Sequence, residues 1–149
     1  MISRIGAGAA GILVVLLAAC GTNTTLPGRQ VTIYVANNSS GTVTPISTAT
    51  NTPGPAIKVG SNPQDIAVTP DGKTAYVANF YSGTVTPIST ATNTPGPAIP
   101  TGTAPGWIAV TPDGKTAYVT NEYSGTVTPI SKTHNTPHQS YKKVTKARW

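Results

Sequence analysis

A four-residue pattern that recurs three times constrains the fold more than any other feature of the sequence. Tyr34-Val35-Ala36-Asn37 returns as Tyr76-Val77-Ala78-Asn79 and as Tyr118-Val119-Thr120-Asn121, at intervals of 42 residues. Residues 34–75 and 76–117 differ at only eight of these 42 positions. A period this regular predicts repeated copies of one supersecondary unit that stack on their neighbours.

Each repeat carries the signals of strands and tight turns. Segment 65–69 places Ile and Val on one face and Ala and Thr on the other, which predicts a first strand. Pro70-Asp71-Gly72 then predicts a hairpin turn. We expect further strands over 73–79 and 84–89 and a fourth, outer strand over 98–101. Four short antiparallel strands in about 42 residues, apolar or small on both faces, are typical of a β-propeller blade.

With the strands placed, the recurring string identifies a family that the chain resembles. Tyr118-Val119-Thr120-Asn121 and the longer string Ile108–Ser131 resemble the YVTN β-propeller repeat proteins, over roughly residues 31–131. The resemblance implies a closed ring of blades, commonly seven, in exported or cell-surface proteins; some related propellers are lactonases. One departure is the proline at 45, 87 and 129, which removes a ladder donor. It predicts a bulged or bent third strand with weak outer pairing.

The repeats are too few to close a ring of the usual size. The pattern supplies two to four strands of a first blade, a complete second blade and one to three strands of a third. Propellers typically have four to eight blades. We therefore expect an all-β fold of four-stranded antiparallel blades over residues 30–131, in an incomplete ring of fewer than three blades. A truncated gene or fragment is the preferred explanation, and a ring assembled from several chains is the alternative.

Residues 1–19 have the order of a secretory signal peptide. Arg4 precedes an uncharged apolar run, 12–17, which is shorter than the roughly 20 residues of a transmembrane helix. Leu17-Ala18-Ala19-Cys20 resembles the lipobox of bacterial lipoproteins, which implies a lipid on Cys20; an ordinary signal peptide with a chance cysteine is the alternative. Residues 20–29 would then be a tether. We expect an exported protein anchored to the bacterial membrane or cell surface through this lipid.

The formal charge of +6 lies outside the repeats. Between Cys20 and Ser131 four basic residues balance four acidic ones, and the excess consists of Arg4 and of five basic residues in the tail, residues 132–149. A groove for nucleic acid needs clustered Lys and Arg, so no nucleic-acid partner is expected. The tail predicts either a degraded fourth strand near 140–144 or a contact with anionic lipid or cell-wall polymer.

No constellation of residues predicts catalysis, a cofactor or a metal site. Asp71 and Asp113 occupy the same turn in different repeats, and neither has a second carboxylate beside it. His134 and His138 are four residues apart, but Pro137 interrupts a helix there and no third ligand accompanies them. We expect a non-catalytic binding or scaffolding module. The alternative is a fragment of a lactonase-like enzyme, which would need carboxylates or histidines converging from several blades.

The positions at which the repeats differ predict where binding occurs. The eight differing pairs are 38/80, 39/81, 58/100, 59/101, 61/103, 62/104, 64/106 and 65/107. Several of them introduce aromatic residues at strand ends, where side chains on a rigid scaffold can contact a partner. The predicted binding rim consists of Phe80, Tyr81, Trp107 and Tyr123, and the alternative role for these residues is packing between blades. The partner would be an unknown protein or a cell-wall polymer.

Overall fold

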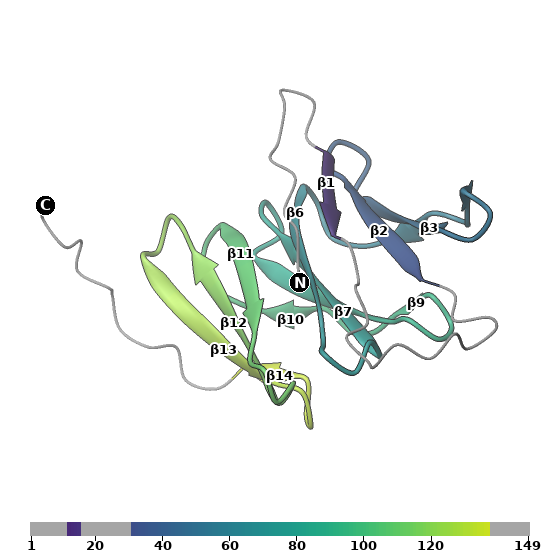
Figure 1. The fold of residues 1–149 in the computed structure, drawn as a ribbon. Coiled ribbons are helices and arrows are strands. Elements are labelled where there is room, and N and C mark those ends of the chain that lie inside the picture. The colour runs from purple at the N-terminus through teal and green to yellow at the C-terminus, as the bar shows by residue number, and fades with distance from the viewer. Residues whose placement is uncertain (1–11, 16–30, 138–149) are drawn as a thin grey trace, which may run out of the picture.

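The computed structural model describes residues 12–15 and 31–137, which form three antiparallel sheets without a helix (Figure 1). Sheet 1 consists of β1 (Ile12–Val15), β2 (Thr32–Asn37), β3 (Thr42–Ser47), β4 (Thr52–Pro53) and β5 (Ile57–Lys58). Sheet 2 consists of β6 (Pro63–Val68), β7 (Thr74–Asn79), β8 (Thr84–Ser89), β9 (Thr94–Pro95) and β10 (Ile99–Pro100). Sheet 3 consists of β11 (Pro105–Val110), β12 (Thr116–Asn121), β13 (Thr126–Ser131) and β14 (Thr136–Pro137). The all-β prediction is confirmed, with four or five strands in each sheet.

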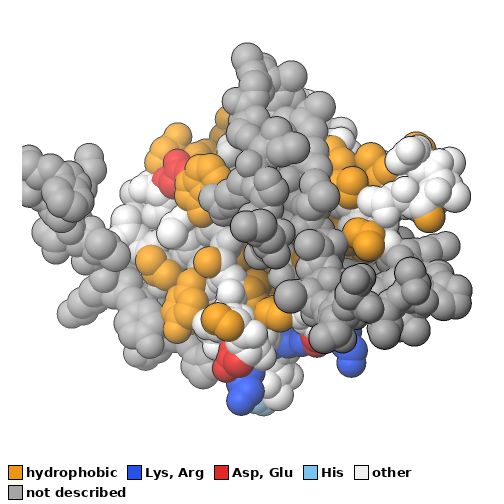
Figure 2. All heavy atoms as spheres, viewed as in Figure 1, with side chains coloured by type: hydrophobic (Ala, Val, Ile, Leu, Met, Phe, Trp, Pro, Cys, Tyr) orange, Lys and Arg blue, Asp and Glu red, His pale blue; other side chains and the backbone are white. Residues whose placement is uncertain are grey.

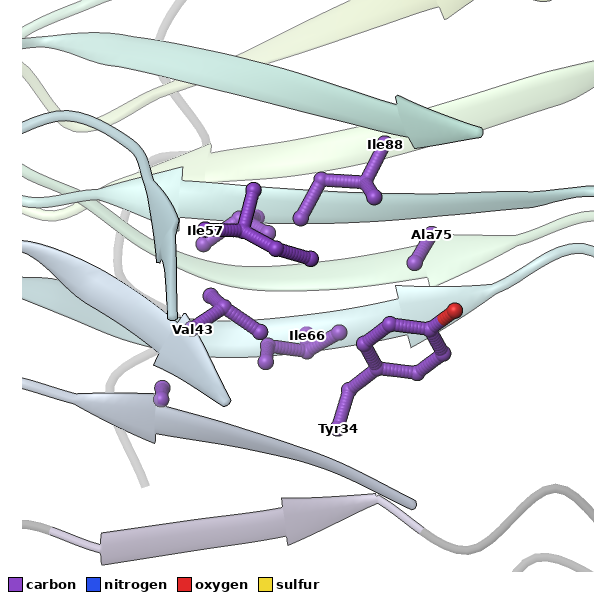
Figure 3. Packing of buried hydrophobic residues seen from close by; sticks show 8 residues of the cluster. Tyr34, Val43, Ile57, Ile66, Ala75 and Ile88 are labelled. Atoms are coloured by element: carbon purple, nitrogen blue, oxygen red, sulfur yellow. The ribbon is translucent and has the colours of Figure 1, made fainter. Parts of the chain in front are cut away.

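The core lies in two layers, one between each pair of neighbouring sheets. The first layer, shown in Figure 3, consists of Tyr34, Ala36, Val43, Ile57, Ile66, Ala75, Val77 and Ile88. The second consists of Tyr76, Ala78, Val85, Ile99, Ile108, Ala117, Val119 and Ile130. Each residue of the second layer stands 42 positions after its counterpart in the first. The sequence repeat is therefore also a repeat of the interface between sheets.

Burial along the second strand of each sheet shows which faces are covered. In β7 every residue from Ala75 to Asn79 is buried, so sheet 2 is covered on both faces. In β12 buried and exposed residues alternate, and in β2 only Tyr34 and Ala36 are buried. The outer sheets are thus covered on one face each, on opposite sides. Burial of both faces, expected for every blade, holds for sheet 2 alone.

A tyrosine–asparagine hydrogen bond connects each sheet to the next. The Tyr34 hydroxyl donates to Asn93 Oδ1 at 2.7 Å, and the Tyr76 hydroxyl donates to Asn135 Oδ1 at 3.2 Å. Asn93 and Asn135 have φ values of 55° and 47°, a left-handed conformation that asparagine tolerates better than most residues. The tyrosine of the recurring pattern therefore joins its own sheet to the outer turn of the following one.

The proline in the third strand of sheets 1 and 2 divides the outer strand instead of bending the inner ladder. β2 and β3 pair without interruption from Thr32↔Ser47 to Asn37↔Thr42, so the predicted bulge in the third strand is wrong. The Pro45 carbonyl accepts a bond from Gly54 N, so its missing N–H also faces the outer side. Outer pairing stops at residues 44–45, with β5 on one side and β4 on the other. The predicted weakness of outer pairing is confirmed.

Two features of the strand inventory differ from expectation. Sheet 3 contains four strands, not one to three, because the two-residue strand β14 forms where sequence similarity fades. β1, within the predicted signal peptide, pairs with β2 in the place that β6 and β11 hold in the other sheets. Counting β1, the described residues form three sheets, where fewer than three blades were expected. Cys20 and the tether lie outside the described residues, so their roles stay predictions.

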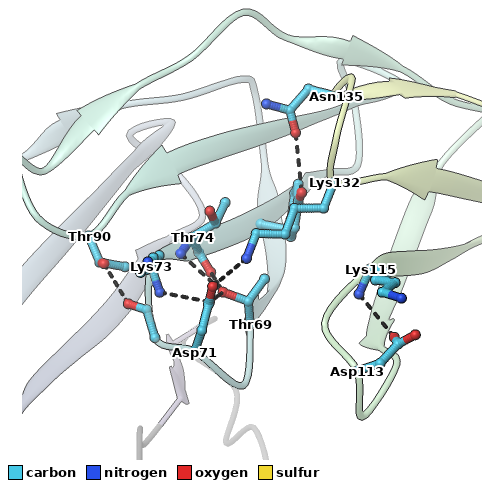
Figure 4. A network of polar contacts seen from close by, with 11 residues as sticks. Thr69, Asp71, Lys73, Thr74, Thr90, Asp113, Lys115, Lys132 and Asn135 are labelled. Atoms are coloured by element: carbon cyan, nitrogen blue, oxygen red, sulfur yellow. Dashed lines mark hydrogen bonds and ion pairs between the residues drawn. The ribbon is translucent and has the colours of Figure 1, made fainter.

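The two Pro-Asp-Gly segments form the predicted turns (Figure 4). Asp71 Oδ1 accepts bonds from Thr69 Oγ1 and Lys73 N, and Asp113 Oδ1 accepts the corresponding bonds in sheet 3. Asp71 also forms an ion pair with Lys132 of sheet 3.

On the face drawn in Figure 2, basic side chains of the described residues gather along the lower edge. The described part of the chain has no helix long and apolar enough to cross a membrane.

The ion pair predicts a small dependence of stability on pH. Hydrogen bonds from Lys132 and then Thr69 lower the pKa of Asp71 well below its ordinary value. A lowered folded-state pKa contributes stability above the unfolded pKa of about 3.9, and this contribution is lost as pH falls below it. The two side chains are 30% and 40% exposed, so we expect a contribution of at most about 1 kcal/mol.

Lys132→Thr is the matched variant, because Thr48 and Thr90 stand at the corresponding positions of sheets 1 and 2. Urea unfolding at pH 6 and pH 2.5 should show that the wild-type chain loses more stability than the variant. Equal losses in the two chains would contradict the assignment.

Candidate functional site

The site is built on two equivalent loops at one end of sheets 2 and 3. The β7–β8 loop and the β12–β13 loop each close with a glycine of left-handed backbone, Gly83 (φ 63°) and Gly125 (φ 61°). Phe80 N donates to Asn62 O, and Glu122 N donates to Ala104 O, at 2.9 and 2.8 Å. These bonds tie each loop to the segment that leads into its own sheet. The side chains at the loop tips therefore project from a fixed backbone.

Three aromatic rings from these loops come together. The Phe80 ring contacts Tyr81 edge-to-face at 5.5 Å and Tyr123, from the next sheet, at 5.4 Å between centroids. Tyr81 and Tyr123 are each 75% exposed. Aromatic pairs favour this edge-to-face geometry, which leaves both tyrosine rings available to a partner while Phe80 fixes their spacing.

The rings border an open cavity of about 380 Å³. Its lining consists of Phe80, Tyr81, Ser82, Gly83, Thr101, Gly102, Thr103, Ala104 and Tyr123. None of these described residues is charged. Five of the eight positions at which the first two repeats differ line this cavity: 80, 81, 101, 103 and 104. Differences scattered along 42 residues of sequence thus meet at one place.

The corresponding place between sheets 1 and 2 carries amide side chains that bond to one another. Asn62 Nδ2 donates to Asn38 Oδ1 at 2.6 Å, and Gln64 Nε2 donates to Asn62 Oδ1 at 3.0 Å. Phe80, Ala104 and Gly106 replace these three residues between sheets 2 and 3.

Two of these replacements have specific geometric effects. Gly106 allows Glu122 to lie close, since a Cβ at Gly106 would be 2.3 Å from Glu122 Oε1. Ala104 has φ 58°, the same left-handed value as Asn62, and its side chain is buried at the cavity.

Trp107, the fourth residue of the predicted rim, lies elsewhere. A register shift between Pro105 and Trp107 precedes its pairing with Thr120, and Trp107, Ala109, Tyr118 and Thr120 are all exposed on the outer face of sheet 3. Trp107 is 51% exposed and is absent from the cavity lining. The structure therefore brings together Phe80, Tyr81 and Tyr123. Sequence reasoning missed Thr101, Thr103 and Ala104 as lining residues, although the differing positions had already marked them.

The residues weighed for acid–base or metal chemistry do not converge. Asp71 and Asp113 are held in separate turns, where each carboxylate accepts a bond from a threonine hydroxyl of its own turn. Within residues 12–15 and 31–137 no group of three or more His, Cys, Asp or Glu could hold a metal ion. His134 is exposed, and His138 lies outside the described residues. The described part of the site offers aromatic faces, hydroxyls and backbone groups.

Comparisons with solved structures show the fold. A chain of Kuenenia stuttgartiensis hydrazine synthase is 30% identical over 73% of this chain and 32% of its own length, with a TM-score of 0.70. A protein assigned as a 6-phosphogluconolactonase, from Bacteroides fragilis, is 22% identical over 75% of this chain and 36% of its own, with a TM-score of 0.66. AztD from Citrobacter koseri is 13% identical over 89% and 42%, with a TM-score of 0.64.

These relatives are propeller-like proteins, and the three sheets are arranged as propeller blades. This chain spans about a third of the length of the first two structures that it matches. No family model matches the sequence, and no curated protein matches it.

Proposed function

We propose that this chain is a binding module in which the cavity between sheets 2 and 3 receives the partner. The observation that carries the proposal is the convergence of repeat differences on the cavity. Two repeats that differ at only eight of 42 positions have five of these differences in the cavity lining, Phe80, Tyr81 and Ala104 among them. Packing of sheet on sheet needs no such divergence, because sheets 1 and 2 pack through the same core residues without it.

The partner that this lining suits best is a neutral, hydroxyl-rich polymer, such as the glycan of a bacterial cell wall. Exposed tyrosine rings stack on the apolar faces of sugars, and Ser82, Thr101 and Thr103 offer hydroxyls beside them. Absence of charge from the described lining favours a neutral partner over an anionic one. We propose, with the sequence as support, that the module belongs to the YVTN repeat class and is exported and anchored through a lipid on Cys20.

Hydrolysis by a lactonase-like site is the alternative. The protein from Bacteroides fragilis that is assigned as a lactonase shares the fold at 22% identity, which carries no information on activity. The described cavity lining contains no carboxylate and no histidine to act as acid or base. We therefore propose a non-catalytic role.

Removal of the aromatic loop tests this proposal. Phe80→Asn with Tyr81→Ser converts the β7–β8 loop to the sequence of the β2–β3 loop, whose closing glycine has the same backbone angle. The double variant should fold as the wild type does and should bind purified peptidoglycan sacculi at least tenfold more weakly, as expected when aromatic contacts worth about 2 kcal/mol are lost. Co-sedimentation measures the binding, and thermal unfolding checks the fold.

Ser39→Ala is the control, since Ser39 occupies the loop position of Tyr81 in sheet 1. Its binding should equal that of the wild type. Equal binding by the double variant would show that the cavity is not the contact site. A wild-type chain that does not sediment with sacculi would exclude the cell-wall glycan as the partner.

A further inference from the structure

Sheets 1 and 3 each have one uncovered face. Together these two faces correspond to the two sides of the interface that joins sheet 1 to sheet 2 and sheet 2 to sheet 3. Tyr34 and Tyr76 are 0% and 1% exposed because the following sheet covers them, whereas Tyr118, at the same repeat position, is 40% exposed. Ala36 and Ala78 are buried, and Thr120 at that position is exposed. Sheet 3 thus presents the face that sheets 1 and 2 each use to bind their successor.

Sheet 1 presents the complementary face. Ile33, Val35 and Ile46 are only half-buried, although their counterparts in sheets 2 and 3 are fully buried against the preceding sheet. Those counterparts are Ala75, Val77 and Ile88 in sheet 2 and Ala117, Val119 and Ile130 in sheet 3. The three apolar side chains lie on β2 and β3, so this face does not depend on β1.

The tyrosine–asparagine hydrogen bond that connects neighbouring sheets also lacks one partner at each outer sheet. Asn51 stands 42 residues before Asn93 and 84 before Asn135, and its φ of 54° matches their values of 55° and 47°. Asn93 and Asn135 accept bonds from Tyr34 and Tyr76. Within the described residues, the Tyr118 hydroxyl and the Asn51 side chain take part in no such bond. Asn51 is therefore already in the conformation that a tyrosine of a preceding sheet would meet.

We propose that a second copy of this chain places its sheet 1 against sheet 3, head to tail, and so repeats the internal interface across the boundary between chains. Head-to-tail contacts form a closed ring when the rotation between subunits allows it. Two chains of three sheets supply six blades, within the four to eight of known propellers, whereas three chains supply nine. The ring is therefore a dimer, with Tyr118 of each chain bonded to Asn51 of the other.

The interface between chains is not identical to the internal ones: besides Thr120 and Ile33, which each stand in place of an alanine, it carries Trp107. Asp65 Oδ2 accepts a bond from Ile108 N across the boundary between sheets 2 and 3, and Trp107 replaces this carboxylate on the outer face of sheet 3. Trp107 adds apolar area to the uncovered face. The proposal does not depend on the cavity between sheets 2 and 3, so its test is independent of the test of the proposed function.

Complementary charge variants test the pairing. Sedimentation velocity of the wild-type chain in mild detergent should give a particle of two chains, after correction for bound detergent. Tyr118→Glu and Asn51→Lys should each associate at least tenfold more weakly and sediment as single chains. Mixed in equal amounts, they should restore the two-chain particle, because one junction then carries Glu opposite Lys and the other carries the native pair.

Ser89→Glu is the control, because Ser89 is exposed on β8 of sheet 2, whose two faces are both covered within the chain, and it should remain a two-chain particle. Thermal unfolding confirms that each single variant is folded. A wild-type chain that stays single at all concentrations would overturn the proposal and favour a different segment as the occupant of these faces. Single variants that associate as strongly as the wild type, or a mixture that stays single, would also overturn it.

Discussion

Tyr76→Ala is expected to destabilise the fold by about 3–5 kcal/mol, the usual cost of removing a large aromatic side chain from a core. The Tyr76 ring is 1% exposed in the layer between sheets 2 and 3, and its hydroxyl donates to Asn135. Tyr118→Ala removes the same residue from the same repeat position, but this ring is 40% exposed. At concentrations at which the chain is single, Tyr118→Ala should cost less than about 1 kcal/mol. Urea denaturation of the variants measures both values.

Tyr34→Ala supplies the internal check, because Tyr34 is as buried as Tyr76 and makes the equivalent bond at 2.7 Å. Its cost should be close to that of Tyr76→Ala. A cost for Tyr118→Ala as large as the other two, in a single chain, would mean that residues of the chain itself cover the outer face of sheet 3.

Asn79→Ala is expected to cost about 3 kcal/mol. The Asn79 side chain is fully buried, donates to Thr84 Oγ1 and Thr86 Oγ1, and accepts a bond from Gly60 N at 3.2 Å. Alanine leaves these partners without a bond in a place that water reaches poorly, and each such group costs about 1–3 kcal/mol. Denaturant unfolding, with the slope checked for two-state behaviour, measures the loss.

Asn37→Ala is the matched control for this prediction. Asn37 donates to Thr42 and Thr44 in the same arrangement, but it is only half-buried. Solvent can replace its bonds, so the cost should be nearer 1 kcal/mol. Equal costs for Asn37 and Asn79 would show that burial between sheets contributes nothing to this hydrogen-bond network. The recurring asparagine would then act only within its own hairpin.

The strands could be predicted from sequence because local alternation and turn residues determine them. The predicted third strand, 84–89, coincides with β8, and the Pro-Asp-Gly segments form the turns expected of them. The tyrosine–asparagine connection could not be predicted, because its partners are 59 residues apart, one repeat and part of the next. Such a pairing depends on how far each sheet is displaced from its neighbour, which no local pattern encodes.

The sequence predicted an aromatic rim at the loop tips, but it did not predict correctly which residues form it. Comparison of the repeats identified Phe80, Tyr81 and Tyr123, because unusual residues at loop tips are visible in sequence. Trp107 was assigned to the same rim for the same reason. The register shift just before it, between Pro105 and Trp107, could not be seen in sequence, and such an irregularity changes which way a strand residue points. One shifted residue therefore separates Trp107 from the cavity.

The backbone at Ala104 adds support to the proposed binding role of this cavity. Alanine in a left-handed conformation is strained by about 1–2 kcal/mol, a strain that asparagine relieves more easily. The preceding repeat has asparagine, Asn62, at this position with the same φ of 58°. The chain thus carries the less favourable residue where the better one is present 42 positions earlier. Retained local strain of this kind is typical of surfaces shaped by recognition, where stability has been traded for a binding contour.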